Sequence, residues 1–479
     1  MSGEAEPLVL GIDDGTTAVK VALFDARLEP IATARRPVPT SNPAPGRVEQ
    51  DADAVLAAVV DAVAEVLPAA GGRAIVAAGL DHQGESVLAW DAATGAPRSP
   101  IVVWQDKRGT EAYDHVAPEL LARTGLPADP YFSAPKLSWL VRALGPDLDG
   151  VRLGTVDAFL CDRLGAGSAT DPSTASRTAL QDLRTPGWDA ELCAAFGLPV
   201  GVLPAVRPTA GDLGTLRHPR WGDVALPLRA RVCDQQAALA GAGCVRPGLT
   251  KATYGTGVFV LAHAGDAAPE GATARGLLPT VAWQVDGRVE YALDGGVFTA
   301  GALLEWLSGT LGLAADPRAL AELAASVLDA GGVRVLPALA GAGAPWWRPE
   351  AHAVIAGLTA AATPAHIARA ALEAIAHRVA DIVEAGGAAL EVLRVDGGLT
   401  NSDLLCQLQA DVLGVPVERG AADATVAGAA GLALVGAGVL PDVAALEALS
   451  PTRDRFTPRG DTTAERAAWR RFATAAFEL

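Results

Sequence analysis

Lysine is scarce in this chain of 479 residues. Only four lysines occur, so arginine carries almost all of the positive charge, and the formal net charge is -17 at pH 7. Nucleic acids and anionic membrane surfaces both favour proteins with clustered Lys and Arg. We therefore expect neither of them to be the main partner of this chain.

Cysteine is also scarce, and its spacing predicts no metal site. The five cysteines form no C-x-x-C pair and lie beside no histidine cluster; they are Cys161, Cys193, Cys233, Cys244 and Cys406. We expect reduced, mostly buried thiols in a cytoplasmic protein. Cys233 borders a candidate site described below, where a buried thiol without a catalytic role is the simpler interpretation.

Long hydrophobic runs are absent. No apolar run reaches the roughly 18 residues that indicate a membrane-spanning helix. Residues 1–7 are acidic and lack the basic and apolar regions of a signal peptide. We expect a soluble, cytoplasmic protein without a membrane span.

Short apolar runs and amphipathic segments are present instead, and they alternate along the chain. Residues 8–12, 19–24 and 74–80 are typical of buried strands, and residues 53–67 of a helix. This alternation predicts an α/β fold. The length exceeds what one hydrophobic core supports and indicates roughly two to four domains.

One arrangement, a strand followed by a small polar turn and a second strand, occurs twice. It occurs first around residues 13–17 and again past the midpoint, where residues 252–254 lead into Gly255-Thr256-Gly257 and the apolar run 258–261. The repeat predicts two similar domains. We place their boundary at a Pro-Gly step, which gives domains of residues 1–245 and 246–479.

The second half contains a further strand, turn and helix. A helix begins at Thr363-Pro364, with an N-cap and a first-turn proline, and ends at Gly386-Gly387. Residues 393–395 then form a strand that enters Asp396-Gly397-Gly398, and another helix follows from about residues 401–404. Backbone N–H groups at such a turn can surround a nucleotide.

The first polar turn offers the groups that bind phosphates and a metal. Phosphoryl transfer needs phosphate donors, a metal carboxylate and a base for the attacking hydroxyl group. Asp13 is a candidate Mg²⁺ ligand, Gly15 permits close backbone approach, and Thr16, Thr17 and Lys20 add donors and positive charge. An ordinary β-hairpin turn is the alternative, because Asp-Gly pairs are common there.

The second polar turn resembles the first in its chemistry. Gly255 and Gly257 flank Thr256, whose N–H and hydroxyl groups are then free to contact a β- or γ-phosphate. A glycine-rich hairpin is again the alternative. Taken together, the two turns predict a nucleotide held between two domains.

A candidate base follows the apolar stretch 230–233. Asp234 can accept the proton of an attacking hydroxyl group, and the amide of Gln235 can hydrogen-bond a second one. A helix N-cap is the alternative role for Asp234, and one residue can serve in both roles.

Three further residues are candidate polyol contacts. The Glu85 carboxylate can accept hydrogen bonds from vicinal hydroxyl groups, the Tyr131 ring can cover carbon atoms, and Trp104 can form part of the pocket wall. Surface or core packing is the favoured interpretation of each of them when it is taken singly.

Together these stretches resemble the FGGY family of carbohydrate kinases, and within it the glycerol kinase branch. The similarity extends from about residue 8 to residue 439 in family order. The segments that carry it are Gly11–Thr17, Val103–Asp106, Asp129–Ser133, Gly154–Asp157, Ala175–Thr178, Asp234–Leu239, Thr253–Gly257, Gly343–Trp347 and Val395–Gly398.

The resemblance implies two actin-like (ribonuclease H-like) domains with an active-site cleft between them. ATP would lie mainly on the second domain and the polyol or sugar on the first, and closure would exclude water. A homodimer is compatible with the resemblance. It implies that Asp234 is the catalytic base, that Gln235 contacts a substrate hydroxyl group and that Asp13 serves Mg²⁺. The implied nucleotide contacts are Thr16, Thr17 and Thr256 at the phosphates, Gly301 and Glu305 near the ribose and adenine, and Gly398 and Ser402 in the adenine-side loop.

One departure from the family pattern bears on the substrate. Glycerol kinases carry Arg-Glu where this chain has Gly84-Glu85, and their arginine donates to glycerol hydroxyl groups. Gly84 removes these donors and leaves space, so we expect a tetritol, pentitol or ketose, with glycerol itself as the alternative. Smaller departures affect nucleotide contacts: Asp14 replaces Gln, Lys20 replaces Arg, and Glu305 replaces Gln. Some bacterial glycerol kinases bind a feedback inhibitor at a glycine-rich loop that contains arginine. Residues 213–224 contain no such loop, so we expect this inhibitor site to be missing.

Two functions of other classes are compatible with the same fold. An actin-like ATPase switch would not need Asp234-Gln235 or the pair Glu85 and Tyr131. A non-catalytic sugar-binding regulator would be expected to lose the carboxylate of Asp13 or Asp234, and both are present. The sequence therefore favours an ATP-dependent carbohydrate kinase.

Overall fold

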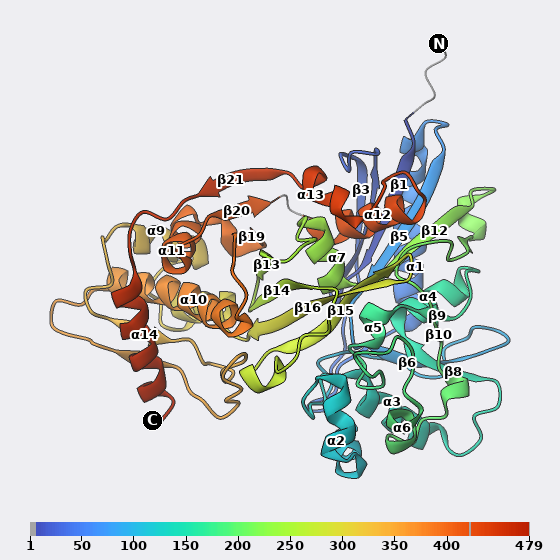
Figure 1. Ribbon diagram of the computed structural model, residues 1–479, viewed down its shortest axis with the longest axis horizontal. Helices are drawn as coiled ribbons and strands as arrows, with labels where there is room; N and C mark the ends of the chain where they lie inside the picture. The colour runs from blue at the N-terminus through green and yellow to red at the C-terminus, as the bar shows by residue number, and fades with distance from the viewer. Residues whose placement is uncertain (1–5, 421–422, 479) are drawn as a thin grey trace.

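Two α/β halves lie side by side in the computed structural model, which describes residues 6–420 and 423–478 (Figure 1). The first half contains a six-stranded sheet of order β11-β12-β5-β1-β2-β3. Its strands are β1 (Leu8–Asp14), β2 (Ala18–Phe24), β3 (Pro30–Pro37), β5 (Ile75–His82), β11 (Thr215–Leu216) and β12 (Leu226–Cys233).

The second half contains a seven-stranded sheet of order β15-β16-β14-β13-β19-β20-β21. Its strands are β13 (Leu249–Tyr254), β14 (Val258–Gly265), β15 (Leu278–Val285), β16 (Arg288–Val297), β19 (Val392–Asp396), β20 (Val417–Gly420) and β21 (Thr452–Phe456).

The two sheets share one topology. In the first, β1, β2 and β3 form an antiparallel meander, and β5 and β12 extend it in parallel with β1. In the second, β13, β14 and β16 form the corresponding antiparallel run, with β15 paired on the outer side of β16, and β19 and β20 extend the sheet in parallel with β13. The strand–turn–strand repeat in the sequence is the opening of each sheet.

One long segment of the second half crosses to the first. Helix α12 (Ala424–Gly436) packs on α7 (Asp234–Gly241) and on the first sheet. Glycine permits this approach, because a Cβ atom at Gly428 would lie 1.8 Å from the carbonyl oxygen of Ala237. The domain boundary near residue 245 stays a prediction, because α12 of the second half packs on elements of the first.

Helices pack on the main sheet of each half. Helix α1 (Ala52–Val66) packs on β2 and β3, and the predicted helix at Thr363 is α10 (Pro364–Gly386), which Gly387 ends with a φ of 73°. The other α-helices are α2 (Pro118–Leu121), α3 (Ser133–Leu144), α4 (Val156–Arg163), α5 (Pro172–Ala175), α6 (Ala190–Ala195), α8 (Gly301–Glu305), α9 (Pro317–Ala325), α11 (Asp403–Leu413), α13 (Leu446–Leu449) and α14 (Thr463–Ala476).

A small sheet is inserted in the first half. Its order is β4-β7-β6-β8, and α3 packs against its strand β6. The remaining strands are β4 (Glu49–Gln50), β6 (Val87–Asp91), β7 (Ile101–Val102), β8 (Val151–Thr155), β9 (Ala169–Thr170), β10 (Ala205–Val206), β17 (Arg334–Leu336) and β18 (Val354–Ala356).

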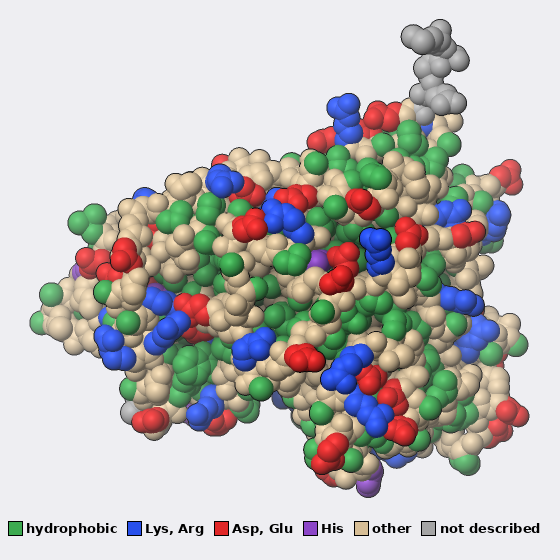
Figure 2. Space-filling view, viewed as in Figure 1, with side chains coloured by type: hydrophobic (Ala, Val, Ile, Leu, Met, Phe, Trp, Pro, Cys, Tyr) green, Lys and Arg blue, Asp and Glu red, His purple; other side chains and the backbone are tan. Residues whose placement is uncertain are grey.

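Charged side chains of both signs intermix on the face shown in Figure 2. All five cysteines are buried and none is in a disulfide. Within residues 6–420 and 423–478, no helix is both long and apolar enough to cross a membrane.

Candidate active site

Three carboxylates meet at the ends of parallel strands of the first sheet. Asp13 on β1 is aligned with Asp81 on β5, and Asp234 follows the end of β12. Parallel strands end at the same edge of a sheet, so the topology brings these side chains together. Asp81 was missed by the sequence analysis, although it follows the apolar run 74–80 just as Asp13 follows 8–12.

Asp234 is the first residue of α7, and Cys233 is the N-cap. The alternative that Asp234 acts as an N-cap is therefore wrong. A negative charge in the first turn is favoured by the helix dipole. One Asp234 oxygen accepts a hydrogen bond from the Gln235 N–H at 2.7 Å, and the carboxylate lines the pocket described below.

The carboxyl groups of β1 and β5 are strongly perturbed. Burial raises the pKa of Asp13 to about 6, and the negative charge of Asp234 adds to this effect. Burial raises the pKa of Asp14 to about 8, and the pKa of Asp81 lies well above its usual range for the same reason. Such a cluster favours a bound cation, which would stabilise the ionised form of Asp13.

The donor set fits Mg²⁺ better than a metal held by protein ligands alone. No group of three or more His, Cys, Asp or Glu side chains in the described part of the chain is arranged to hold a metal ion. Mg²⁺ typically uses one or two carboxylates and completes its shell with water and substrate phosphates. Asp13, which is only partly buried, fits this type of site.

The first phosphate turn, residues 13–17, is hydrogen-bonded to Trp104, one of the predicted substrate residues. The Trp104 indole N–H donates to the Thr16 hydroxyl oxygen at 2.9 Å, which leaves the Thr16 O–H free to donate elsewhere. Thr17 is exposed, and Gly15 is partly buried. Lys20 forms an ion pair with Asp423, so its positive charge already has a partner.

The second phosphate turn lies against the start of α8. Gly301 donates its N–H to the Gly255 carbonyl oxygen at 3.0 Å. A Cβ atom at Gly301 would lie 2.6 Å from that oxygen, so the approach requires glycine. Thr256, at the tip of the turn, is exposed. The structure therefore brings these three predicted nucleotide residues together.

Gly398 and Ser402, two other predicted nucleotide residues, line a separate cavity of the second half. Leu304 also lines it, and its neighbour Glu305 is exposed. The Ser402 hydroxyl oxygen accepts the Leu405 N–H as the N-cap of α11.

Four of the six predicted substrate residues meet in one small pocket. Glu85, Tyr131, Asp234 and Gln235 line it. Glu85 has a positive φ of 59°, which is uncommon for a residue other than glycine and occurs often at functional sites. Trp104 does not line the pocket, but packs edge-on against the Tyr131 ring with centroids 5.4 Å apart.

The loop that carries Tyr131 is held by a buried lysine. The Lys136 ammonium group donates to the carbonyl oxygens of Pro130, Tyr131 and Phe132 at 2.6–2.8 Å. These three bonds fix the backbone on both sides of Tyr131. Lys136 was not predicted as a site residue, and it acts by positioning the ring.

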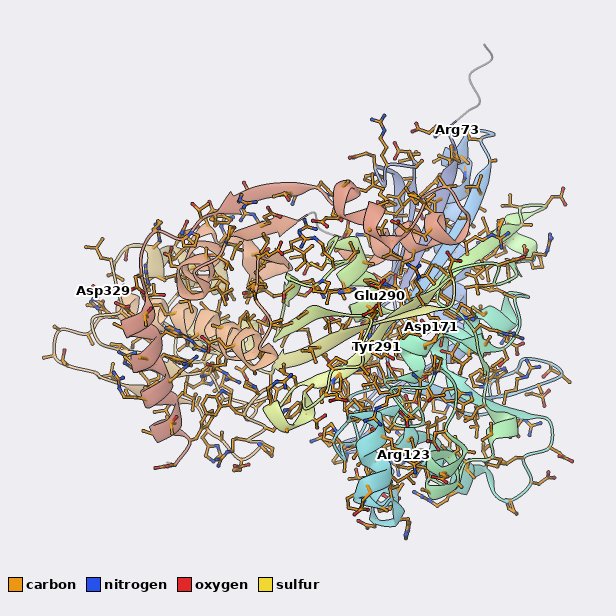
Figure 3. The ribbon with its side chains drawn as sticks, in the orientation of Figure 1. Arg73, Arg123, Asp171, Glu290, Tyr291 and Asp329 are labelled. Atoms are coloured by element: carbon orange, nitrogen blue, oxygen red, sulfur yellow. The ribbon has the colours of Figure 1, made fainter. Side chains whose placement is uncertain are left out.

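Two charged residues of the pocket were also missed. Arg177 follows α5, whose N-cap residue Asp171 is labelled near the centre of Figure 3. The Arg177 Nε donates to Glu85 at 2.7 Å, and Nη2 lies 3.0 Å from Asp294 on β16. The second half therefore contributes a side chain to the substrate pocket.

Gly84 does not leave the space that was expected. A Cβ atom at this position would lie 2.7 Å from the Cys233 sulfur and 3.9 Å from an Asp234 oxygen. The Cys233 side chain thus fills the volume beside Gly84. Because positions 84 and 233 occupy one volume, a larger residue at one requires a smaller residue at the other.

We predict that Gly84→Arg alone impairs the protein, because the new side chain meets Cys233. The double variant Gly84→Arg/Cys233→Gly should recover at least tenfold in kcat/KM relative to the single variant, since the volume is exchanged between the two positions. Steady-state kinetics of both single variants and the double variant measure this coupling. Additive effects on activity would contradict it.

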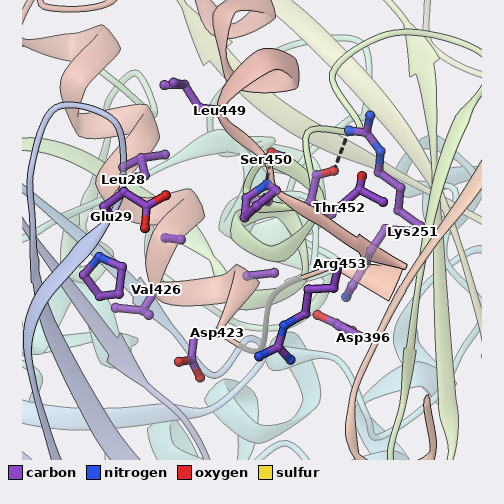
Figure 4. A pocket seen from close by; sticks show the side chains of 18 of the residues that line it. Leu28, Glu29, Lys251, Asp396, Asp423, Val426, Leu449, Ser450, Thr452 and Arg453 are labelled. Carbon is purple, nitrogen blue, oxygen red and sulfur yellow. Dashed lines mark hydrogen bonds between the residues drawn. The ribbon is translucent and has the colours of Figure 1, made fainter. Parts of the chain in front are cut away.

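Another cavity lies between the two halves, beside the β2–β3 hairpin and the start of α12 (Figure 4). Lys251 lies in its wall, and its ammonium group donates to the Gln235 side-chain oxygen at 3.1 Å. A buried residue of the second half thus orients a predicted substrate ligand of the first half.

Comparison with known proteins agrees with this geometry. The family models for the N-terminal and C-terminal domains of the FGGY family of carbohydrate kinases match residues 8–241 and 250–437. The paired sheets and the carboxylates at their cleft define a phosphotransferase that acts on an alcohol group. The chain belongs to the FGGY family of carbohydrate kinases, and kinases of this family use ATP.

Individual relatives are similar over nearly the whole chain. A glycerol kinase from Geobacter sp. (strain M21) is 43% identical over 475 residues, which cover 94% of each protein. The crystal structure of Plasmodium falciparum glycerol kinase with ADP has a TM-score of 0.91 and 27% identity, and covers 99% of both chains. A xylulose kinase from Rhodospirillum rubrum has a TM-score of 0.87 and 26% identity, and covers 98% of both. The predicted family and the two-domain actin-like fold are confirmed.

Proposed function

We propose that the protein transfers the γ-phosphoryl group of MgATP to a hydroxyl group of glycerol. One observation carries this proposal: Glu85, Tyr131, Asp234 and Gln235 line one small pocket beside the carboxylate cluster. The 43% identity to a glycerol kinase also supports glycerol over the tetritol, pentitol or ketose expected from Gly84.

The chain's own residues would perform the following steps. Asp234 accepts the proton of the attacking hydroxyl group, so that the oxygen becomes a better nucleophile. Gln235 and Glu85 hold the other hydroxyl groups, and the Tyr131 ring covers the carbon atoms. Lys251 fixes the Gln235 amide from the opposite half, so the substrate is oriented only when the two halves are together.

The nucleotide would bind mainly to the second half. The Thr256 turn contacts the phosphates together with the turn of Gly15 and Thr16, and Gly398 and Ser402 border the adenine. Asp13 would hold Mg²⁺, which would neutralise charge on the phosphate oxygens. Exclusion of water from the closed cleft would prevent hydrolysis of ATP in the absence of alcohol.

A coupled assay of ADP release against glycerol, tetritols, pentitols and ketoses tests this proposal. We expect glycerol to give the highest kcat/KM, by at least tenfold over any pentitol, because the pocket is small. A longer polyol preferred over glycerol would contradict the proposed substrate. Absence of ADP release with every compound would contradict the proposed reaction.

A further inference from the structure

The proposed mechanism leaves the Arg177 side chain without a role, although it lines the pocket. The side chain is 5% exposed. Two of its nitrogens are paired with Glu85 and Asp294, whereas Nη1 has no hydrogen-bond partner among residues 6–420 and 423–478. A buried guanidinium N–H without a partner is unfavourable, and buried polar groups in proteins are rarely left so.

Two other residues that line this pocket also carry an unpartnered polar atom, in each case an acceptor. The Asp294 Oδ1 and Gln236 Oε1 atoms are buried and have no hydrogen-bond partner in the described part of the chain. A hydroxyl group both donates and accepts one hydrogen bond or more. A polyhydroxylated ligand can therefore satisfy a free donor and free acceptors in one small space, which an apolar ligand cannot do.

The position of the Arg177 guanidinium group is fixed by its surroundings. Its central carbon lies 5.7 Å from the Tyr131 ring centroid and 5.6 Å from that of Phe132, within the range of cation–π contact. Ion pairs with Glu85 and Asp294 fix the remaining orientation. Nη1 is thus held in place before a ligand binds, which reduces the entropic cost of recognition.

We propose that Arg177 Nη1 donates a hydrogen bond to a hydroxyl group of the acceptor substrate and supplies the donor that Gly84 lacks. This inference rests on the proposed function, because it takes the acceptor to be a polyol. Cys233, which fills the volume beside Gly84, lines the pocket, and Arg177 lines it from the segment after α5. Through Asp294, recognition of the alcohol also depends on the second half.

The variant Arg177→Lys tests this role. Lysine keeps the positive charge that Glu85 and Asp294 require, but it lacks the planar fork and therefore Nη1. We expect kcat/KM for glycerol to fall about tenfold to a hundredfold, mainly through KM, as for loss of a hydrogen bond to a charged group. KM for ATP should change less than about threefold, because Arg177 does not line the predicted adenine cavity.

Substrate analogues separate recognition from structural support. 1,2-Propanediol and 1,3-propanediol each lack one hydroxyl group of glycerol. The wild-type protein should discriminate against at least one of them, and Arg177→Lys should lose that discrimination. Arg466→Lys is the matched control, because Arg466 is a buried guanidinium group paired with Asp381 and Glu384 outside the pocket. It should retain the wild-type preferences.

The outcomes distinguish this inference from the proposed function. An unchanged preference for glycerol over both diols in Arg177→Lys overturns the inference while the kinase activity stands. If the wild-type protein turns over no polyol, the proposed function fails, and calorimetry then decides: polyol binding that Arg177→Lys does not weaken overturns the inference. If Arg177→Lys does not fold, a crystal structure of the wild-type protein with bound glycerol tests the inference instead. An Nη1–hydroxyl distance of about 3 Å supports the role, and one beyond about 4 Å overturns it.

Discussion

Asp234→Asn should lower kcat by about 10³-fold while leaving the affinity for ATP near that of the wild-type protein. An amide cannot accept the proton of the attacking hydroxyl group, and removal of a general base typically costs 10²–10⁴-fold. The substitution is nearly isosteric, and Asp234 lies at the start of α7 beside the substrate pocket. Steady-state kinetics and calorimetric titration with ATP measure the two effects separately.

The control for this variant is Asp212→Asn, which alters an exposed aspartate paired with Arg229 on the surface. It should leave kcat unchanged within twofold. Full activity of Asp234→Asn would remove Asp234 from the role of base. Equal loss of ATP affinity and turnover would instead indicate a general collapse of the cleft.

Asp13→Asn should lower kcat/KM at least a hundredfold and raise the Mg²⁺ concentration needed for half-maximal activity. A neutral amide is a weaker ligand for Mg²⁺ than a carboxylate. Burial raises the pKa of Asp13 to about 6, so the wild-type group is protonated below that pH and ionised above it. Wild-type activity at limiting Mg²⁺ should therefore fall as the pH drops through about 6, and saturating Mg²⁺ should shift this fall to lower pH.

Asp14→Asn is the matched control for Asp13→Asn. Burial raises the pKa of Asp14 to about 8, so its carboxyl group is mostly neutral at pH 7, and an amide replaces it with little change in charge. The Mg²⁺ dependence of Asp14→Asn should match that of the wild-type protein. An unchanged Mg²⁺ dependence in Asp13→Asn would contradict the assignment of Asp13 as the metal ligand.

The elements that were predicted correctly are those whose apolar runs and end signals lie within one short segment of the sequence. The apolar runs 8–12 and 19–24 became β1 and β2, and the N-cap and glycine signals bounded α10 within one residue. Asp13 and Asp234 were found because each follows a buried strand, and a strand end is visible in the sequence.

The residues that were missed depend on contacts distant in sequence. Asp81 lies beside Asp13 only because β5 pairs in parallel with β1. The register of that pairing cannot be predicted from either segment alone. Asp294 lies in the middle of β16 and reaches Arg177 across the cleft. The space expected at Gly84 was misjudged because Cys233, 149 residues later, fills it. Packing between distant segments decides such features.

A crystal structure of the protein with MgADP and glycerol tests the central claim most directly. The account predicts an Asp234 carboxylate oxygen within about 2.6–3.2 Å of one glycerol hydroxyl group, with that hydroxyl facing the terminal phosphate of the nucleotide across the cleft. A glycerol bound with all of its hydroxyl groups beyond hydrogen-bonding reach of Asp234, or on the far side of the nucleotide from it, would contradict the account.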